Sequence, residues 1–444
     1  MNKKEAFMKT LSVVSLGKLG ACTAACFAYK GYNVIGIDIN RNLIDAINNG
    51  KAPICEPRLQ ELITASKGRL KGSQDYEEAI SNSDVTFLVV PTPSREDGHF
   101  SDKFLRDALS FLSQALKKLN KKYHLFVIVS TVSPGTTEES LIPLIEAVSG
   151  KKLNKDFGIC YNPEFIALGS VITDFLNPDM VLIGESDKHA GDILEEIYKK
   201  VCENSPYIAR MSIISAEITK ISLNSYITMK ISFANTLANI CEKIEGADID
   251  AITRALGADK RVSPYYLKGG PAYGGPCFPR DNRAFAAFAQ KYGYEAKLAK
   301  ATDEMNQYQI SHLKELVLKH LPEDRKVSIL GLAYKPNTPV IEESMAIKLI
   351  DALLKHDMEI TVYDPLAMDN TKAAFGDAIK YASSLKECLS SSSYWIFTLP
   401  YDEFKTIDYI FVIHNPTIII DCWRMLEPEK LGDKVRYIAL GRNK

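Results

Sequence analysis

An apolar strand that runs into a glycine turn near the N-terminus restricts the fold of this chain more than any other feature of the sequence. Residues 11–16 form an apolar run suited to a buried strand, and Gly17 and Gly20 follow it. Residues 21–30 have the composition of a helix, and residues 34–38 form a second apolar run that ends in an aspartate. A strand, a tight turn, a helix and another strand in this order predict a βαβ unit with parallel strands.

The same unit is a fingerprint for binding a dinucleotide. In such units the turn admits a pyrophosphate to the helix N-terminus, and an acid about 20 residues later binds the ribose hydroxyls. We therefore expect Gly17, Leu19, Gly20 and Asp38 to bind NAD. Asp38 would repel the 2′-phosphate of NADP, although Arg41, a cation at the same expected site, leaves NADP open.

Two further apolar runs, at 85–90 and 125–130, flank a helical segment at 102–119 and extend the predicted sheet. This alternation predicts parallel strands, with a ligand at their carboxyl ends. Those ends carry Thr92 and Thr131. Taken alone, both threonines are equally typical of ordinary turns.

Capping chemistry predicts where two helices begin. Thr136 and Glu139 have the spacing of a capping box, which predicts a helix start after the 125–130 run. Asp281 directly precedes residues 282–289, which have the composition of a helix. We therefore expect Asp281 to be the N-cap of that helix.

A loop rich in glycine and proline, residues 269–281, presents one thiol, Cys277. Its composition excludes a helix or a central strand. A thiol just before a helix N-terminus faces unpaired N–H groups, which favour the thiolate and lower the pKa of the thiol. Cys277 is therefore a candidate nucleophile, and the alternative is a small buried hydrophobic residue.

One long helix is predicted from 212 to 246, at more than twice the average helix length of about 11–12 residues. Such a helix suggests a spine that joins two domains or two subunits. Lys220 and Asn224 are four residues apart and share one face of it. Glu164 follows an Asn-Pro pair, where a solvated loop carboxylate is the usual finding.

The strand and helix pattern returns after the Cys277 loop. Apolar runs at 327–334, 359–364, 393–398 and 417–421 predict a second doubly wound domain, with a helix at 344–356 after the first run. Its first turn lacks the glycine fingerprint, so we expect a different ligand. Lys335, at the end of the first of these strands, is placed to meet a phosphate.

Length and composition exclude several classes of protein. A chain of 444 residues predicts two or three domains, which we place at 1–205, 206–305 and 306–444. A formal charge of −1 gives no basic excess for nucleic acid, and no apolar run reaches the ~20 residues of a membrane span. Nine scattered cysteines without paired spacing indicate no structural metal and a reducing, cytoplasmic compartment.

With these features in order, the chain resembles the UDP-glucose/GDP-mannose dehydrogenase family over nearly its whole length. The most specific similarity is Gly-Gly-Pro-Cys-Phe-Pro-Arg-Asp at 274–281, close to the family's Gly-Gly-Ser-Cys-Phe-Pro-Lys-Asp. The other similar segments are 91–93, 130–132, 162–165, the helix with Lys220 and Asn224, and 331–338. The resemblance implies an α/β fold with two doubly wound Rossmann-like domains, joined by a long central helix and a small helical domain.

The resemblance also implies an activity, in which NAD oxidises a primary alcohol to a carboxylate in two steps. Asp281 and Lys220, with a water, would take the C6 hydroxyl proton, and Cys277 would attack the aldehyde. Lys220 and Asn224 would stabilise the oxyanion, and Glu164 would assist hydrolysis of the thioester. Thr92 and Thr131 would lie at the cofactor, with Thr131 placing water and nicotinamide.

For the substrate, the resemblance implies a nucleotide-sugar and a homodimer or larger homo-oligomer. The expected sugar-nucleotide residues, besides Glu164, Lys220 and Asn224, are Tyr266, Leu267, Gly270, Lys335 and, across a subunit interface, Arg261. UDP-glucose is the first expectation, and GDP-mannose or another UDP-hexose is the second. A two-electron β-hydroxyacid dehydrogenase and a non-catalytic NAD-binding regulator are alternatives from other classes.

Several positions depart from the family pattern. Ser15 stands where the dinucleotide fingerprint has its first glycine. Ala167 and its neighbours replace a charged segment after Glu164, and Glu342 reverses a charge. Trp423 lies within Asp-Cys-Trp-Arg, where the family has Asp-x-Arg, so the role of Arg424 stays open. These changes bear on the identity of the sugar and leave the residues of the chemistry in place.

Overall fold

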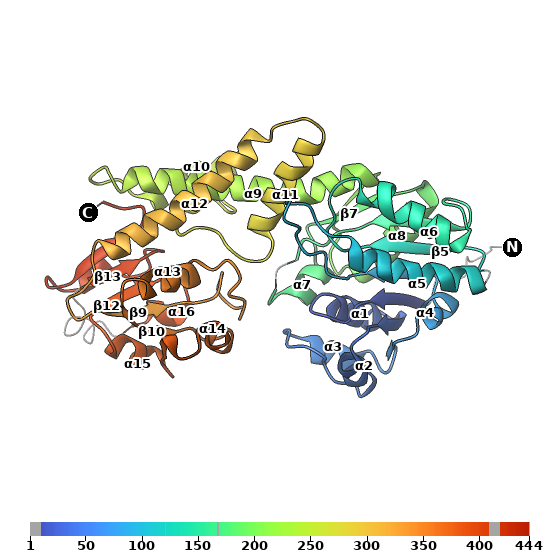
Figure 1. The fold of residues 1–444 in the computed structure, drawn as a ribbon, viewed down its shortest axis with the longest axis horizontal. Coiled ribbons are helices and arrows are strands. Elements are labelled where there is room, and N and C mark those ends of the chain that lie inside the picture. The colour runs from blue at the N-terminus through green and yellow to red at the C-terminus, as the bar shows by residue number, and fades with distance from the viewer. Residues whose placement is uncertain (1–9, 120, 167, 408–417, 444) are drawn as a thin grey trace. The chain divides into compact units, whose positions relative to one another are not determined.

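The computed structural model describes residues 10–119, 121–166, 168–407 and 418–443. The chain forms two compact units, Met1–Ile221 and Ser222–Lys444. The secondary structure of both is shown in Figure 1. Ala167 and Thr417, which entered the sequence predictions, lie outside the described residues.

The first unit is built on an eight-stranded sheet in the order β3-β2-β1-β4-β5-β6-β7-β8. The order of the first six strands is that of a doubly wound dinucleotide fold. All neighbours pair in parallel except β6 and β7. The strands are β1 (Thr10–Val14), β2 (Asn33–Ile37), β3 (Leu70–Ser73), β4 (Val85–Leu88), β5 (His124–Ile128), β6 (Phe157–Tyr161), β7 (Met180–Glu185) and β8 (Tyr207–Ser212).

Helices enclose this sheet, which explains why its central strands are continuous apolar runs. Helix α1 consists of small apolar residues and packs against α3 and α7, so that nine of its ten residues are buried. The helices of the unit are α1 (Gly20–Tyr29), α2 (Arg41–Asn48), α3 (Leu59–Ala65), α4 (Tyr76–Asn82), α5 (Lys103–Leu119), a π-helical turn (Thr137–Leu141), α6 (Ile142–Ser149), α7 (Val171–Leu176) and α8 (Lys188–Val201).

The second unit holds a parallel sheet in the order β11-β10-β9-β12-β13-β14, which repeats the doubly wound order. The strands are β9 (Lys326–Leu330), β10 (Glu359–Tyr363), β11 (Lys380–Tyr381), β12 (Tyr394–Phe397), β13 (Ile418–Asp421) and β14 (Arg436–Ala439). The helices around it include α13 (Met345–Leu354), α14 (Met368–Phe375), α15 (Leu385–Ser390) and α16 (Asp402–Lys405). The predicted α/β class with two Rossmann-like sheets is therefore confirmed.

Helical segments precede this second sheet. Helix α9 (Ile213–Cys241) runs through the division between the units, and α10 (Ile249–Ala258), α11 (Phe278–Lys291) and α12 (Lys297–Leu318) follow. The predicted end of α9 at residue 246 was wrong. The N–H groups of Lys243 and Ile244 donate to carbonyls three residues back, so the helix tightens into turns after Cys241.

The predicted cap at Asp281 was wrong as well. Helix α11 begins at Phe278, with Cys277 at the N-cap and Asp281 inside the first turn. Pro279 fits in that turn because its missing N–H needs no partner there. The other predicted helix does start at its expected place, with Thr136 at the N-cap position. The Thr136 side chain makes no cap there, and its hydroxyl donates to the Ser133 carbonyl oxygen.

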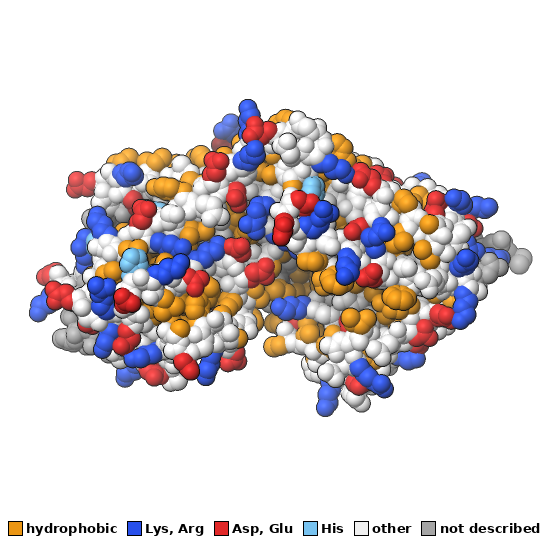
Figure 2. All heavy atoms as spheres, in the orientation of Figure 1, with side chains coloured by type: hydrophobic (Ala, Val, Ile, Leu, Met, Phe, Trp, Pro, Cys, Tyr) orange, Lys and Arg blue, Asp and Glu red, His pale blue; other side chains and the backbone are white. Residues whose placement is uncertain are grey.

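The surface matches the near-neutral charge of the sequence. Figure 2 shows basic and acidic side chains interspersed over the visible face of each unit. Among the described residues, no helix combines the length and the apolar character that crossing a bilayer requires.

Candidate active site

The turn between β1 and α1 is held open for an anion. The Leu16 N–H donates to Asp38 Oδ2 at 2.6 Å, which fixes the carboxylate that ends β2. A Cβ on Gly20 would lie 2.0 Å from the Ser15 carbonyl oxygen, so only glycine fits there. Helix α1 begins at Gly20, and its N-cap residue, Leu19, makes no side-chain cap, which leaves N–H groups of the first turn for a pyrophosphate.

Ser15 shows why this turn departs from the fingerprint and still forms. Its φ of 83° lies in the left-handed region that normally requires glycine. The next residue is anchored to Asp38, whose other oxygen accepts the N–H of Asn40 at 2.8 Å. Arg41 follows as the first residue of α2. The predicted NAD residues of this turn thus gather around one helix N-terminus, and the glycine cradle fits the cofactor.

The loops after β4 and β5 are tied to each other. The Thr92 hydroxyl donates to the Thr131 carbonyl oxygen at 2.6 Å, and the Ser130 hydroxyl donates to the Val90 carbonyl oxygen at 2.6 Å. The two threonines expected at the cofactor are therefore neighbours. They lie at the carboxyl ends of adjacent parallel strands, where ligands of such sheets bind.

Glu217, a residue that sequence reasoning missed, fastens α9 to the loop after β5. It is completely buried and accepts the N–H of Gly135 at 2.6 Å and both the N–H and the hydroxyl of Thr137, at 3.1 and 2.6 Å. Burial raises the pKa of its carboxyl to about 7, although these hydrogen bonds oppose the shift. Glu217 thus replaces the predicted capping box as the cap of this helix start. In the sequence, only its position three residues before Lys220 points to Glu217. At that position it looks like an ordinary glutamate on a helix surface.

Glu164, in the loop after β6, is half-buried. The Tyr198 hydroxyl lies 3.1 Å from Glu164 Oε1 and 2.6 Å from Asn162 Oδ1. Desolvation raises the pKa of Glu164 to about 7, while Tyr198 and the charge of Lys220 oppose the shift. A carboxyl that titrates near neutrality can act as a general base. Tyr198, on α8, carries no local sequence signal because its contact with Glu164 is purely tertiary.

Lys220 lies beside the same loop. Its Nζ donates to the Glu164 carbonyl oxygen at 2.7 Å and lies 4.7 Å from the centre of the Phe165 ring. Only 8% of the residue is exposed. The structure therefore brings the predicted pair Glu164 and Lys220 together within the first unit, with the ammonium held at a fixed position.

In the second unit, Asn224 and Asp281 form a direct pair. Asn224 Nδ2 donates to Asp281 Oδ2 at 2.7 Å, and Arg280 Nε lies 3.2 Å from Asp281 Oδ1. One position further along each helix, the Ser225 hydroxyl donates to Asn282 Oδ1 at 2.8 Å. These two adjacent pairs fasten α9 to the first turn of α11 and bury Asp281 to 1% exposure.

Cys277 is exposed at the N-cap of α11. Its carbonyl oxygen accepts the Asp281 N–H at 2.8 Å, as the first turn of a helix requires. The thiol thus stands at the positive end of a helix, in the position that the sequence predicted. Such a position favours the thiolate.

The loop before Cys277 packs against the loop after β9. Gly275 has φ 85°, and a Cβ there would lie 2.4 Å from the Tyr334 ring, while its N–H donates to the Glu342 carbonyl oxygen at 3.0 Å. Burial, and then the nearby Cys277 and Tyr266, raise the pKa of Tyr334 to about 12. Tyr334, which sequence reasoning did not single out, thus lies beside the thiol and stays a neutral phenol.

The expected sugar-nucleotide residues have differing surroundings. Two hydrogen bonds fix the backbone of Gly270. Its N–H donates to Asn235 Oδ1 at 2.8 Å, and its carbonyl oxygen accepts from Gln309 Nε2 at 2.8 Å. Leu267 is buried, whereas Tyr266 is half exposed in the left-handed conformation. Lys335 Nζ lies 5.9 Å from the centre of the Tyr334 ring. Arg261 pairs with Asp259 at 2.7 Å, with 88% of its side chain in solvent.

Trp423 and Arg424, from a segment that departs from the family pattern, contact the loop before Cys277 at Gly269 and Gly270. The Trp423 ring would be 3.1 Å from a Cβ on Gly270. The buried Arg424 pairs with Asp250 at 2.8 Å and donates to the Gly269 carbonyl oxygen at 2.8 Å. Arg424 therefore anchors the loop backbone in this structure. The residues that the structure describes contain no cluster of three or more His, Cys, Asp or Glu that could hold a metal ion.

Comparison with known proteins matches this arrangement in all parts of the chain. Three models of the UDP-glucose/GDP-mannose dehydrogenase family match, for the NAD binding domain at residues 9–202, the central domain at 214–308 and the UDP binding domain at 328–428. The chain is 37% identical to UDP-glucose 6-dehydrogenase AglM of Haloferax volcanii, over 94% of this chain and 97% of that protein.

Two further proteins are similar to the chain. GDP-mannose 6-dehydrogenase of Pseudomonas aeruginosa is 36% identical over 80% of both chains. A UDP-glucose dehydrogenase structure from Pyrobaculum islandicum superposes with a TM-score of 0.89 at 30% identity, covering all of both chains.

Proposed function

The chain belongs to the UDP-glucose/GDP-mannose dehydrogenase family, and from this premise we propose that it oxidises the C6 hydroxyl of UDP-glucose to give UDP-glucuronate. The reaction removes four electrons in two hydride transfers to NAD. The observation that carries the proposal is the exposed Cys277 thiol at the N-cap of α11. A two-step oxidation that retains its aldehyde needs such a nucleophile.

In the first oxidation, a water held by Asp281 and Lys220 takes the C6 hydroxyl proton, and a bound NAD would accept the C6 hydride. The products are the aldehyde, NADH and a proton. The pair of Asn224 with Asp281 supports this assignment, because it fixes the carboxylate at 2.7 Å from the amide. Thr92 and Thr131 position the nicotinamide, and their mutual hydrogen bond supports that role.

In the second oxidation, the Cys277 thiolate forms a C–S bond with the aldehyde carbon. The carbonyl oxygen becomes an oxyanion, which Lys220 and Asn224 stabilise as a thiohemiacetal. A second bound NAD would accept the hydride from the same carbon, and the adduct on Cys277 would then be a thioester.

Hydrolysis completes the cycle. Glu164 takes a proton from water, the hydroxide adds to the thioester carbon, and the Cys277 thiolate leaves. The pKa of Glu164, raised to about 7, supports this role because the base form and its conjugate acid are both accessible near neutral pH.

The sugar nucleotide contacts Tyr266, Leu267, Gly270 and Lys335, with Arg261 from a second copy. GDP-mannose is the second candidate, favoured by the 36% identity to a GDP-mannose 6-dehydrogenase. We retain the three proposed domains, 1–205, 206–305 and 306–444, as the units that bind NAD, form the dimer and bind the nucleotide-sugar.

The proposed homodimer uses α9. Three large apolar side chains recur every seven residues on this helix and are about half exposed: Tyr226 at 56%, Phe233 at 54% and Ile240 at 48%. A row of exposed apolar side chains at this spacing is typical of a helix face that packs against a partner. Light scattering of the Phe233→Glu variant tests the assignment. We expect monomers, and an unchanged assembly would place the interface elsewhere.

The proposed reaction is tested by counting NADH formed per sugar nucleotide consumed, with limiting UDP-glucose and excess NAD. About two NADH per UDP-glucose are expected, because the thioester route transfers two hydrides. One NADH with free aldehyde would support a two-electron dehydrogenase. No reaction with UDP-glucose and about two NADH with GDP-mannose would move the substrate and keep the mechanism. NAD binding without oxidation of either substrate would support the alternative that the protein is a non-catalytic NAD-binding regulator.

A further inference from the structure

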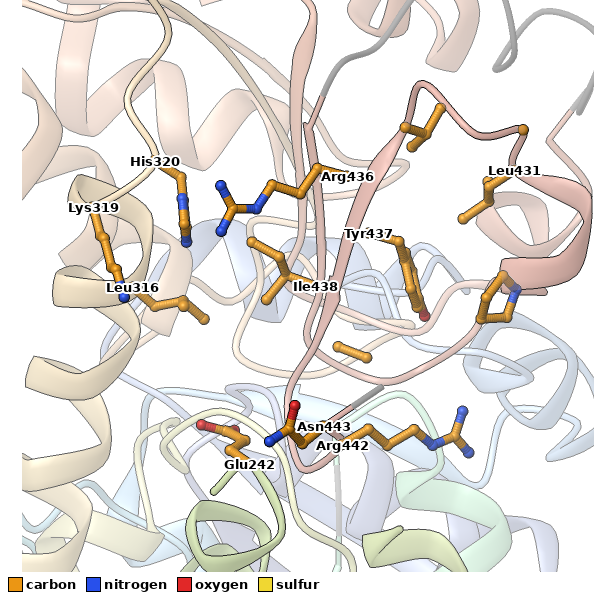
Figure 3. A pocket seen from close by; sticks show the side chains of 14 residues that line it. Glu242, Leu316, Lys319, His320, Leu431, Arg436, Tyr437, Ile438, Arg442 and Asn443 are labelled. Carbon is orange, nitrogen blue, oxygen red and sulfur yellow. The ribbon is translucent and has the colours of Figure 1, made fainter. Parts of the chain in front are cut away.

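A cavity of about 640 Å³ lies in the second unit and is lined by none of the residues of the proposed reaction. One wall is the end of α12 with the two residues after it, and the opposite wall is β14 with the loop before it (Figure 3). Glu242, Arg442 and Asn443 close a third side. We call this cavity the α12–β14 pocket.

A cluster of basic side chains marks one end of the pocket. Lys319, His320 and Arg436 line it, and Figure 3 shows the Arg436 guanidinium turned toward the His320 imidazole. Within the described ranges, neither Lys319 nor Arg436 has an acidic partner in an ion pair, although both are exposed. Burial, and then the charges of Arg436 and Lys319, lower the pKa of His320.

His320 is the most informative member of this cluster. It is 9% exposed, and no hydrogen bond from its ring to any described residue is present, while its backbone N–H donates to Val317. A buried imidazole usually has a hydrogen-bond partner. An imidazole that lines a cavity beside two cations can donate a hydrogen bond to an anionic ligand.

The other charges of the pocket are already balanced. The Glu242 carboxylate accepts the Gly441 N–H at 2.8 Å and lies 2.7 Å from His312 Nε2. Arg442 pairs with Asp250 at 3.1 Å and with Asp248 at 3.0 Å. The uncompensated positive charge is therefore confined to the end with His320.

The remaining walls define the body of a ligand. Leu316, Leu431, Val435 and Ile438 line the pocket with apolar side chains. The cavity volume of about 640 Å³ falls within the roughly 300–1,000 Å³ of small-molecule sites. A phosphate alone would fill a small part of this space.

From these observations we propose that the α12–β14 pocket binds a phosphate-bearing organic molecule, with the phosphate between Lys319, His320 and Arg436 and the organic body against the apolar wall. Guanidinium and ammonium groups are the side chains that bind phosphate most strongly. A protonated His320 adds a further donor once the anion offsets the repulsion from the two cations. The site is independent of the reaction at Cys277.

The test uses the full-length protein labelled for histidine NMR and inorganic pyrophosphate as the probe. His320→Gln identifies the His320 resonance. We expect saturable pyrophosphate binding to raise the pKa of His320 by about one unit or more, as a new anion near an imidazole does. Following this resonance separates the pocket from any pyrophosphate bound near Cys277, so failure here says nothing about the proposed reaction.

Matched variants localise the phosphate. Arg436→Gln is expected to weaken pyrophosphate binding at His320 by about tenfold, the value of one charge-assisted contact. Lys434→Gln removes an exposed charge from the same loop outside the pocket lining and should leave the affinity unchanged. The proposal is overturned if the His320 resonance does not respond up to about 10 mM pyrophosphate, or if both variants weaken binding equally.

Discussion

The first turns of the two Rossmann-like sheets are built alike and end differently. After β1, Ser15 has φ 83° and the Leu16 N–H donates to Asp38 at 2.6 Å. After β9, Gly331 has φ 93° and the Leu332 N–H donates to Asp364 at 2.7 Å. In both, an acid at the end of the second strand holds the turn that comes after the first strand.

The two turns differ in the element that each one leads into. Helix α1 begins at Gly20, directly after the first turn, whereas α13 begins only at Met345. The intervening loop, 331–344, packs its Tyr334 and Glu342 against the glycines before Cys277. The first turn thus presents a helix N-terminus, and the second presents a loop to the thiol.

The two acids differ in the same sense. Asp364 is 1% exposed and also accepts the N–H groups of Ala333, Leu366 and Ala367. Asp38 is only half-buried. The Asp364 carboxylate accepts hydrogen bonds from the protein backbone on both oxygens and is buried. The Asp38 carboxylate accepts fewer and is partly exposed, so it can still accept hydrogen bonds from a ligand. The same topology therefore supports cofactor binding in one unit and support of the thiol loop in the other.

The glycines of the two turns give the largest expected contrast. Gly20→Ala places a methyl group 2.0 Å from the Ser15 carbonyl oxygen, and the displaced turn should weaken NAD binding by about 100-fold. Gly331→Ala strains a residue at φ 93° and should cost about 1–3 kcal/mol of unfolding free energy, with the NAD affinity unchanged. Calorimetric titration and chemical denaturation measure both. Equal losses of NAD affinity would break the comparison.

The comparison extends to the sixth strand of each sheet. β6 leads to Glu164, with a pKa of about 7, whereas β14 leads to Leu440 and Gly441. Because the base form of Glu164 gains population as pH rises through 7, kcat should increase with pH and level off above about 8. Glu164→Gln should lower kcat by about 100-fold or more and remove the increase of kcat with pH. We would measure kcat from pH 5.5 to 9. If kcat of the variant still rises with pH through 7, a group other than Glu164 causes that rise.

Exchanging the two acids for asparagine separates binding from folding. Asp38→Asn should weaken NAD binding by about tenfold, because a neutral amide replaces a charge-assisted acceptor for ribose. Asp364→Asn should instead lower the free energy of unfolding by about 2 kcal/mol, since it faces several buried donors. NAD titrations and denaturation curves of both variants decide the point. A stability loss confined to Asp38→Asn would reverse the assignment.

The smallest effect is expected at Ser15. A non-glycine residue in the left-handed region costs roughly 1–2 kcal/mol, part of which the added chain entropy of glycine offsets. Ser15→Gly should therefore stabilise the protein by at most about 1 kcal/mol. Gly331→Ser is the matched reverse change and should destabilise it. Destabilisation by Ser15→Gly would show that the Ser15 hydroxyl contributes more than its strain costs.

The sequence predicted the sheets because their strands are continuous apolar runs. It predicted the cofactor turn because glycines after a first strand and an aspartate at the end of a second strand are typical of dinucleotide binding. It placed Cys277 correctly before a helix. It misassigned Asp281 because proline is tolerated inside a first helical turn, so the helix begins at Phe278. A local rule for caps cannot decide between two helix starts that are four residues apart.

Glu217 and Tyr198 show what local patterns cannot reveal. Both make contacts across the fold, Glu217 with Thr137 at a helix start and Tyr198 with the candidate site residue Glu164. In the sequence they are an ordinary helix glutamate and tyrosine. Their role depends on burial, which only the tertiary structure gives.

The most direct test of the proposed chemistry is the mass of the Glu164→Gln variant mixed with UDP-glucose and NAD and quenched in acid. Slow hydrolysis should let the thioester accumulate, so a mass increase of one nucleotide-sugar acyl group is expected on the peptide with Cys277. Cys277→Ser in the same background should abolish the adduct. NADH formation at about two per substrate without any adduct on Cys277 would contradict the account, because the aldehyde would then be oxidised without the thiol.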